Sequence, residues 1–381
     1  MSALRILVYF GLVSLFADVT YEGARSITGP FLKTLGASAF LVGFVSGFGE
    51  FLGYGLRIFS GYISDKAKIW WHLTIIGYGL NVIAIPLLGL TKSVEIAIFL
   101  ILMERFGKAI RTPSRDTLLS FVTKKIGAGK GFGLHEAMDQ IGALAGPILV
   151  SFIFFLNGSF KESFLILGIP VIFCMLFLFL AKRSTKLEDY IDKSNLEEEK
   201  LSISFWHYLL FVLISTFGFI HFQMISYHFA KTNLFSLKYI PILYSIAMGF
   251  DAISSLLSGF FFDKKGMSTL IFVPVLTIPL ILLLFSSNKY FAIFGILLWG
   301  LVLGMQESIM RAGISKLAPI KKRGFSYGIF NSLYGLSFFL GSSIMGYLYD
   351  LKINYIIYFS VILNILSLII FLKLKIYKIG K

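Results

Sequence analysis

Long apolar runs follow one another along almost the whole chain. Each run holds about 20 predominantly apolar residues, the length that an α-helix needs to cross the hydrocarbon core of a membrane. Hydrophobic residues make up 57% of the sequence and charged residues only 14%, well below the charge of ordinary soluble domains. The pattern therefore predicts an all-α membrane protein with twelve transmembrane helices, near residues 5–31, 38–63, 71–90, 94–110, 131–156, 162–181, 204–229, 238–262, 269–286, 290–312, 324–349 and 353–372.

The two halves of the chain carry the same short signature after one of these runs. A glycine, an aspartate and the lysine after it occur twice, 198 positions apart, as Gly61, Asp65 and Lys66 and again as Gly259, Asp263 and Lys264. Duplication of this kind is typical of membrane carriers built from two repeats. We therefore expect two pseudo-symmetric six-helix bundles at residues 1–181 and 204–381, joined by a cytoplasmic linker at 182–203.

The net charge of +15 indicates topology rather than nucleic-acid binding. The predicted loops on one side of the membrane hold most of the lysines and arginines, and such basic loops stay in the cytoplasm. We therefore predict a multi-pass protein of the plasma membrane with both termini in the cytoplasm. The first run is too long for a cleaved signal peptide and lacks a small-residue cleavage site, so we expect it to remain as a helix. With one cysteine, Cys174, no disulfide can form within the chain.

The duplicated signature, the six-plus-six runs and the central linker together resemble the major facilitator superfamily over essentially the whole chain. Residues 107–116 resemble a stretch of a poorly characterised prokaryotic branch, and residues 142–147 resemble the fifth-helix signature of the superfamily's exporters. The resemblance implies secondary active transport of a drug or metabolite, with efflux by antiport favoured. Uptake by symport is the alternative.

Three charged residues of the first run, Asp18, Glu22 and Arg25, lie on one face of the predicted helix. A charge near the bilayer centre costs about 2.5–3.5 kcal/mol even on the lenient insertion scale, so these side chains must face a wet cavity, one another or partners on neighbouring helices. We expect Asp18 or Glu22 to exchange a proton during transport, which makes H+ the coupling ion. A static ion-pair network is the alternative. The polar partners expected in the first half are Glu50, Arg57, Glu104, Arg105 and Asp139.

A second set of residues is predicted to gate the two halves. The resemblance implies that Asp65 acts as a latch at the cytoplasmic face, because its spacing from Gly61 matches the family motif. Pro147 removes a backbone hydrogen bond and permits a bend in the fifth helix. For Asp65 and Asp263, the alternative roles are to end a helix and to control topology. The full set is Gly61, Asp65, Lys66, Arg111, Arg115, Asp116, Gly142, Gly146, Pro147, Gly259, Asp263 and Lys264.

The second half offers fewer ionisable groups. Some of its polar residues are expected to line a substrate cavity, with packing as the alternative for the histidines: His221, Gln223, His228, Asp251, Gln306 and Glu307. The histidine spacing does not fit a metal site, and no carboxylate accompanies the histidines in the seventh helix, so no metal is predicted.

Other classes of function lack a supporting motif. The sequence contains no H-E-x-x-H, no G-x-S-x-G and no phosphate-binding loop, so we predict neither an enzyme nor a cofactor. A receptor would need a soluble domain, for which no predicted loop is long enough. The expected partners are a small-molecule substrate, H+ and the lipid bilayer, and a monomer can perform such transport.

Overall fold

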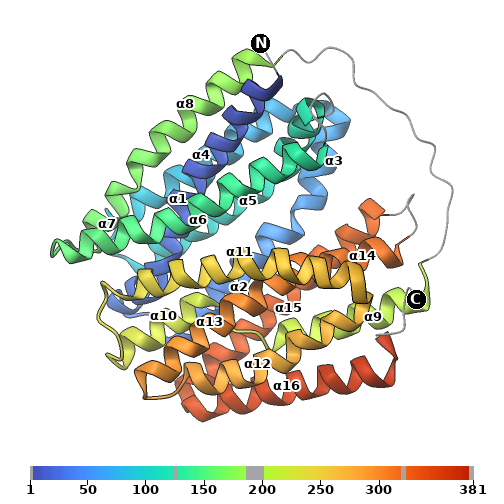
Figure 1. Ribbon diagram of the computed structural model, residues 1–381. Helices are drawn as coiled ribbons and strands as arrows, with labels where there is room; N and C mark the ends of the chain where they lie inside the picture. The colour runs from blue at the N-terminus through green and yellow to red at the C-terminus, as the bar shows by residue number, and fades with distance from the viewer. Residues whose placement is uncertain (1–2, 124–127, 186–200, 319–322, 377–381) are drawn as a thin grey trace. The chain divides into compact units, whose positions relative to one another are not determined.

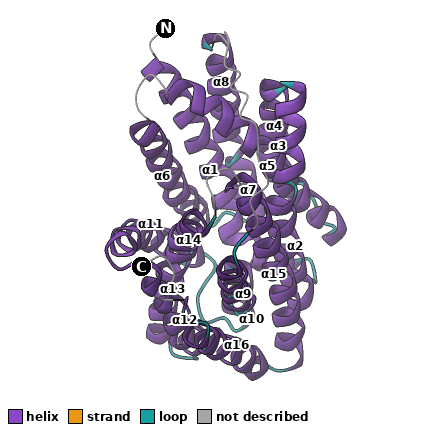
Figure 2. Ribbon diagram, turned by 90° about the vertical axis from the view of Figure 1, so that its right-hand side faces the viewer, coloured by secondary structure: helices purple, strands orange, loops and turns teal. Residues whose placement is uncertain are grey.

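Helices make up nearly all of the described structure (Figures 1 and 2). The computed structural model describes residues 3–123, 128–185, 201–318 and 323–376, and no strand occurs in these ranges. The prediction of an all-α protein is therefore confirmed.

The chain divides into two compact units, which we call the N-unit and the C-unit. The N-unit comprises Met1–Leu35, Leu52–Ser194 and Leu237–Ser245, and the C-unit comprises Gly36–Phe51, Asn195–Ser236 and Ile246–Lys381. Two helices contribute to both units, α2 (Ala39–Gly55) and α11 (Ile240–Lys265). The other helices of the N-unit are α1 (Ala3–Thr34), α3 (Arg57–Ala67), α4 (Trp70–Leu88), α5 (Val94–Thr123), α6 (Ala128–Phe155), α7 (Phe160–Ile166) and α8 (Gly168–Ser184).

The C-unit is built from helices of the second half of the chain together with most of α2. Two of its segments are not α-helical: η1 is a short 3-10 helix and η2 is a π-helix. The elements are α9 (Ile203–Phe217), α10 (Phe222–Lys231), η1 (Gly266–Ile271), α12 (Phe272–Leu284), α13 (Lys289–Met305), η2 (Gln306–Met310), α14 (Arg311–Leu317), α15 (Arg323–Leu351) and α16 (Ile353–Lys373).

Each predicted run coincides with one helix or with two or three helical elements that follow one another along the chain. The largest difference is at the end of the fourth run, where residues 111–130 were expected to form a connection. Instead α5 continues to Thr123 and α6 begins at Ala128, so Arg111, Arg115 and Asp116 lie within a helix. Hydropathy fails here because charged side chains interrupt the apolar pattern while the backbone remains helical.

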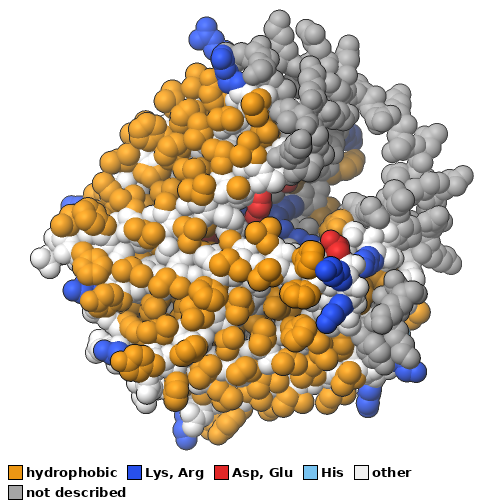
Figure 3. All heavy atoms as spheres, in the orientation of Figure 1, with side chains coloured by type: hydrophobic (Ala, Val, Ile, Leu, Met, Phe, Trp, Pro, Cys, Tyr) orange, Lys and Arg blue, Asp and Glu red, His pale blue; other side chains and the backbone are white. Residues whose placement is uncertain are grey.

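Nine helical stretches of the described residues are long and apolar enough to cross a membrane. Helix α5 is not among them, because it carries several charged residues, including Glu104, Arg105 and Lys108. In the space-filling view, hydrophobic side chains cover most of the visible helices, as expected for surfaces that face lipid (Figure 3). These features support a multi-pass membrane protein.

Glycines bring α1 and α6 into backbone contact inside the N-unit. A Cβ atom added at Gly142 would lie 2.4 Å from the carbonyl oxygen of Leu15, and one added at Gly146 would lie 2.3 Å from that of Val19. Between helices in lipid, small residues allow the close approach on which van der Waals packing depends. The four-residue spacing of the two glycines thus gives α6 a flat face against α1.

We predict that Gly146→Ala destabilises the protein. The new methyl group would meet the α1 backbone, which cannot rotate away, and overpacking of this kind typically costs about 1–3 kcal/mol. Gly133→Ala is the matched control, because Gly133 lies on the same helix with no atom within 4 Å of the added Cβ. Thermal unfolding in detergent measures both variants, and equal unfolding temperatures would contradict a tight α1–α6 contact.

Candidate functional site

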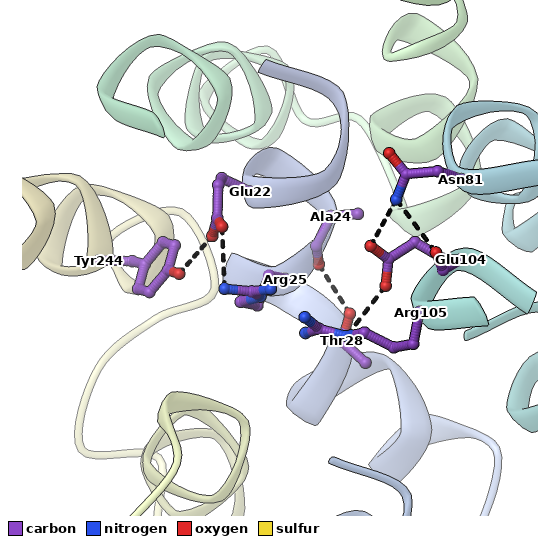
Figure 4. A network of polar contacts seen from close by, with 8 residues as sticks. All are labelled: Glu22, Ala24, Arg25, Thr28, Asn81, Glu104, Arg105 and Tyr244. Atoms are coloured by element: carbon purple, nitrogen blue, oxygen red, sulfur yellow. Dashed lines mark hydrogen bonds and ion pairs between the residues drawn. The ribbon is translucent and has the colours of Figure 1, made fainter. Parts of the chain in front are cut away.

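A cluster of charged side chains lies inside the N-unit on α1, α5 and α6. On α1, the buried Glu22 forms an ion pair with Arg25, with 2.8 Å between Oε1 and Nη1. The hydroxyl of Tyr244, at the start of α11, donates a hydrogen bond to the other oxygen of Glu22 (Figure 4). Both carboxylate oxygens of Glu22 therefore have partners.

A second buried ion pair lies on α5. Arg105 Nε lies 3.0 Å from Glu104 Oε2, and each of these side chains is only 6% exposed. The amide of Asn81 on α4 donates to Glu104 Oε1 at 2.8 Å and to the main-chain oxygen of Glu104 at 3.1 Å (Figure 4). A Cβ at Gly107 would lie 2.5 Å from the main-chain nitrogen of Asn81, so this glycine permits the close α4–α5 contact that makes these bonds possible.

Three cationic groups surround the buried ring of Tyr21 on α1. The ring centroid lies 4.2 Å from Lys108 Nζ, 5.6 Å from Arg25 Cζ and 6.0 Å from Arg111 Cζ. The guanidinium of Arg111 also lies over the ring of Tyr78, at 4.1 Å. Cation–π contacts of desolvated groups contribute about 2 kcal/mol, so the tyrosine rings replace part of the lost hydration. We call Tyr21, Arg25, Lys108 and Arg111 the Tyr21 cluster.

Two acids of the N-unit lack comparable partners. Oδ1 of Asp18 and Oδ1 of Asp139 are buried, and neither has a hydrogen-bond partner among the described residues. Nε2 of His135 lies 3.9 Å from Asp139 Oδ1, which is too long for a hydrogen bond. The two carboxyl groups lie close enough to interact electrostatically. A proton on one of them would remove their mutual repulsion.

Glu50 and Arg57 are the other two N-terminal residues predicted to couple protons. Glu50, on α2, belongs to the C-unit. Arg57 Nε donates to the main-chain oxygen of Gly53 at 2.7 Å, and its guanidinium lies over the ring of Tyr54. Of the residues predicted to couple protons, Asp18, Glu22, Arg25, Arg57, Glu104, Arg105 and Asp139 belong to the N-unit.

Some of the residues predicted to form a latch contact near neighbours in the sequence. Arg115 pairs with Asp116, with 2.7 Å between Nη2 and Oδ1. Lys66 is exposed near the end of α3 and lies over the ring of Tyr62, whereas the side chain of Asp65 lies outside the described part of the structure. Asp263 and Lys264 are exposed in the last turn of α11. A latch role for these residues stays a prediction.

Three polar candidates of the C-unit lie on η2 and α11. Gln306 is buried in the π-helix η2, and its Oε1 accepts a hydrogen bond from the Tyr334 hydroxyl at 3.1 Å. Glu307 follows it in the same π-helix, a type of element frequent at functional sites. Asp251 is buried on α11 beside Gly304, where an added Cβ would lie 3.0 Å from Asp251 Oδ1.

The histidine candidates lie near a break in the predicted seventh helix. Four residues, 218–221, separate α9 from α10, and His221 is the last of them. Its ring lies 4.5 Å from that of Phe338, and Gln223 is buried in the first turn of α10. His228, one turn before the end of α10, shares a hydrogen bond of 2.8 Å with the Tyr349 hydroxyl. In the described part of the chain, no group of three or more His, Cys, Asp or Glu side chains could hold a metal ion.

Several residues of the site were not predicted from the sequence. Tyr21, Tyr78, Asn81 and Tyr244 supply the rings and hydrogen bonds around the charges. Tyr21 follows Asp18 by three positions and therefore shares its helix face, a signal that could have identified it. Tyr244 lies 222 positions from Glu22, so no local pattern connects them.

Comparison with known proteins agrees with this architecture. The sequence model described as Major Facilitator Superfamily matches residues 13–341 and, in a second match, 267–378. An uncharacterized protein of Mycobacterium tuberculosis is 36% identical, over 100% of this chain and 95% of its own length. An uncharacterized MFS-type transporter of Methanocaldococcus jannaschii is 28% identical, over 94% of this chain and 92% of its own length.

A solved structure extends the likeness to the fold. The crystal structure of the nucleoside transporter NupG matches with a TM-score of 0.73 at 14% identity, over 98% of this chain and 99% of that chain. The prediction of twelve transmembrane helices fits this fold. With the family match, the buried charges and the apolar helices taken together, the chain belongs to the major facilitator superfamily of membrane transporters.

Proposed function

We propose that the protein exports a small molecule in exchange for protons, by alternating access, and that Asp18 carries the exchanged proton. The transporter family supports membrane transport. The likeness of residues 142–147 to the fifth-helix signature of exporters supports the outward direction. The buried glycines of this segment, Gly142 and Gly146, bring that part of α6 against the same turns of α1 that carry Asp18.

The buried carboxyl of Asp18 is the observation on which this proposal rests. Its residue is 6% exposed, and its Oδ1 has no hydrogen-bond partner in the described ranges. A buried carboxylate without an ion-pair partner is unfavourable, and a carboxyl group can neutralise itself by taking up a proton. Asp139 lies within electrostatic reach, so the two acids can share the role.

Glu22 is a weaker candidate for the proton than Asp18. Arg25 and Tyr244 hold both oxygens of its carboxylate, so this side chain already has a structural role. Glu104 is held in the same manner by Arg105 and Asn81. We propose that these two ion pairs have a structural role and make up the static network that the sequence predicts as an alternative. Asp18 is then the acid that couples protons to transport.

Uptake by symport is a second candidate function. The observation that favours it is the Tyr21 cluster, because Lys108 interacts electrostatically with Asp18. Protonation of Asp18 would leave the nearby cations with less compensating negative charge and would favour a bound anion. Substrate and proton would then bind together rather than in competition.

Other parts of the sequence prediction belong to the same proposal. We propose the bundles at 1–181 and 204–381, the cytoplasmic linker at 182–203 and cytoplasmic termini, on the strength of the duplication and of the basic loops. Asp65 remains the proposed latch, and the polar residues of the C-unit remain proposed contacts of the substrate. The working form is proposed to be a monomer, with H+ as coupling ion.

We predict that Asp18→Asn uncouples protons from transport. A thermal-shift screen of the purified protein against drugs, sugars, amino acids and organic anions first supplies a ligand, because a ligand bound only by the folded state raises stability. Proteoliposomes containing a pH-sensitive dye then receive this ligand from outside. Antiport raises the internal pH and symport lowers it, whereas Asp18→Asn should still exchange labelled ligand but move no protons.

The exposed Glu136 on α6 provides the control for this experiment, since Glu136→Gln should keep ligand-driven proton movement unchanged. Full proton movement in Asp18→Asn would exclude Asp18 as the carrier of the proton. A ligand flux that never changes the internal pH of the native protein would contradict proton coupling altogether.

We further predict that Glu104→Ala destabilises the protein far more than Asp18→Asn. Removing the carboxylate leaves the buried guanidinium of Arg105 without its Glu104 partner, and such losses typically cost about 3–5 kcal/mol. Asp18 has no comparable partner, so the change to an uncharged amide should cost less than about 1 kcal/mol. Thermal unfolding in detergent compares the two, with Glu136→Ala as reference. If Asp18→Asn lost as much stability as Glu104→Ala, Asp18 would belong to a static network.

A further inference from the structure

The Tyr21 cluster holds more cationic groups than carboxylates that bind them. Of its three cations, Arg25 forms an ion pair with Glu22. Neither Lys108 nor Arg111 forms an ion pair with any carboxylate of the described residues. Both do lie against aromatic rings, Lys108 against Tyr21 and Arg111 against Tyr21 and Tyr78.

Arg111 is the most deeply buried member of this group. Its side chain is among the largest fully buried ones in the described structure, with 1% of the residue exposed. Its Nε and Nη1 atoms have no hydrogen-bond partner among the described residues. An arginine in a protein stays protonated, so these donors cannot be removed by loss of a proton. They require an acceptor.

The nearby acids cannot meet this requirement permanently. Asp18 and Asp139 can each become neutral by binding a proton, whereas the guanidinium of Arg111 cannot lose its charge. Arg111 therefore always presents positively charged hydrogen-bond donors. The forked donors of an arginine side chain suit the binding of an oxyanion.

The backbone is arranged to hold Arg111 in this position. A Cβ atom at Gly77 on α4 would lie 2.7 Å from the Arg111 Cβ, so only glycine permits this arrangement. Lys108 precedes Arg111 by three residues on α5 and therefore projects from the same helix face. Two helices thus fix both cations against the rings of Tyr21 and Tyr78.

We propose that Lys108 and Arg111 bind an oxyanion, a carboxylate or a phosphate group, of the transported small molecule. The inference rests on the proposed carrier function, which it extends by naming the chemical class of the substrate. Arg111 donates two hydrogen bonds to the anion from its free nitrogen atoms. Lys108 adds a second positive charge, and its Nζ lies 4.2 Å from the centroid of the Tyr21 ring.

Equilibrium binding to the full-length protein in phosphatidylcholine nanodiscs tests this proposal. The probes are benzoate and inorganic phosphate, with benzamide as the uncharged match of benzoate. At least one anion should bind, and benzamide should bind at least tenfold more weakly than benzoate if benzoate is the ligand. Arg111→Gln should weaken anion binding at least tenfold, because hydrogen bonds to charged groups are lost. Arg111→Lys should keep part of the affinity.

Stability in the absence of ligand separates a binding role from a structural one. Arg111→Gln removes a buried cation that lacks an ion-pair partner among the described residues, and it also removes the contacts with the Tyr21 and Tyr78 rings. Because these two effects oppose each other, its unfolding temperature should stay close to that of the native protein. The native protein should gain stability from the anion and the variant should not. Arg183, exposed in the last turn of α8, provides the matched control, and Arg183→Gln should bind the anion unchanged.

Four outcomes would overturn the proposal. In the first, neither anion binds at millimolar concentration, and in the second, benzoate and benzamide bind equally well. In the third, Arg111→Gln binds the anion as tightly as the native protein. In the fourth, phosphatidylglycerol in the nanodisc stabilises the protein but free anions do not. The last outcome would assign the site to a lipid headgroup. Ligand-driven proton movement in proteoliposomes is measured separately, so its persistence after such a result would leave the proposed function intact.

Discussion

The cost of burying charge in an apolar environment governs the arrangement of the N-unit. Five basic residues on α1 and α5 lie among helices whose outer surfaces are apolar: Arg25, Arg105, Lys108, Arg111 and Arg115. Three of them have a carboxylate partner within 3.0 Å, namely Glu22, Glu104 or Asp116. Buried ions separated from such partners are strongly destabilising, so the pairs of Glu22 with Arg25 and of Glu104 with Arg105 stabilise the packed helices, whereas Asp116 is half-exposed.

Close helix contacts make this pairing possible. Gly77 and Gly107 allow α4 and α5 to approach until Asn81 reaches both the carboxylate and the main chain of Glu104. Gly142 and Gly146 allow a similarly close approach of α6 to α1, next to Asp18. Since helices in lipid gain little from hydrophobic burial alone, the small residues and the polar contacts depend on each other: the glycines bring the polar groups within reach, and the polar contacts add attraction between the helices.

The fold could be predicted from the sequence far more completely than the site. Apolar runs of about 20 residues leave few alternatives to a membrane helix, and the duplication around Gly61 and Gly259 indicates two repeats. The charged stripe of α1 could be predicted as well, because charges on one helix face must meet partners. The partners themselves could not, since Tyr244 and Asn81 are brought to their carboxylates by tertiary packing across 222 and 23 positions. The length of α5 was missed for a related reason, because hydropathy counts its charges as polar although their partners and the tyrosine rings shield them.

Buried ion pairs are described in the N-unit, and several polar contacts of the C-unit join neutral groups. Several hydrogen bonds of the C-unit join neutral groups, such as Gln306 with Tyr334 and His228 with Tyr349, and serine hydroxyls donate to main-chain oxygens between α11 and α13. The exposed carboxylate of Asp350 accepts hydrogen bonds from the main-chain nitrogens of Ala39 and Phe40. Neutral hydrogen bonds respond weakly to a change of one charge, whereas ion pairs and unpaired ions respond strongly at low dielectric. A proton or an anion that binds near Asp18 therefore changes the energy of the N-unit much more than it would change that of the C-unit. Coupling between an ion and a conformational change requires that the ion change the relative energies of two states, and the buried charges around Asp18 are the proposed means of doing so.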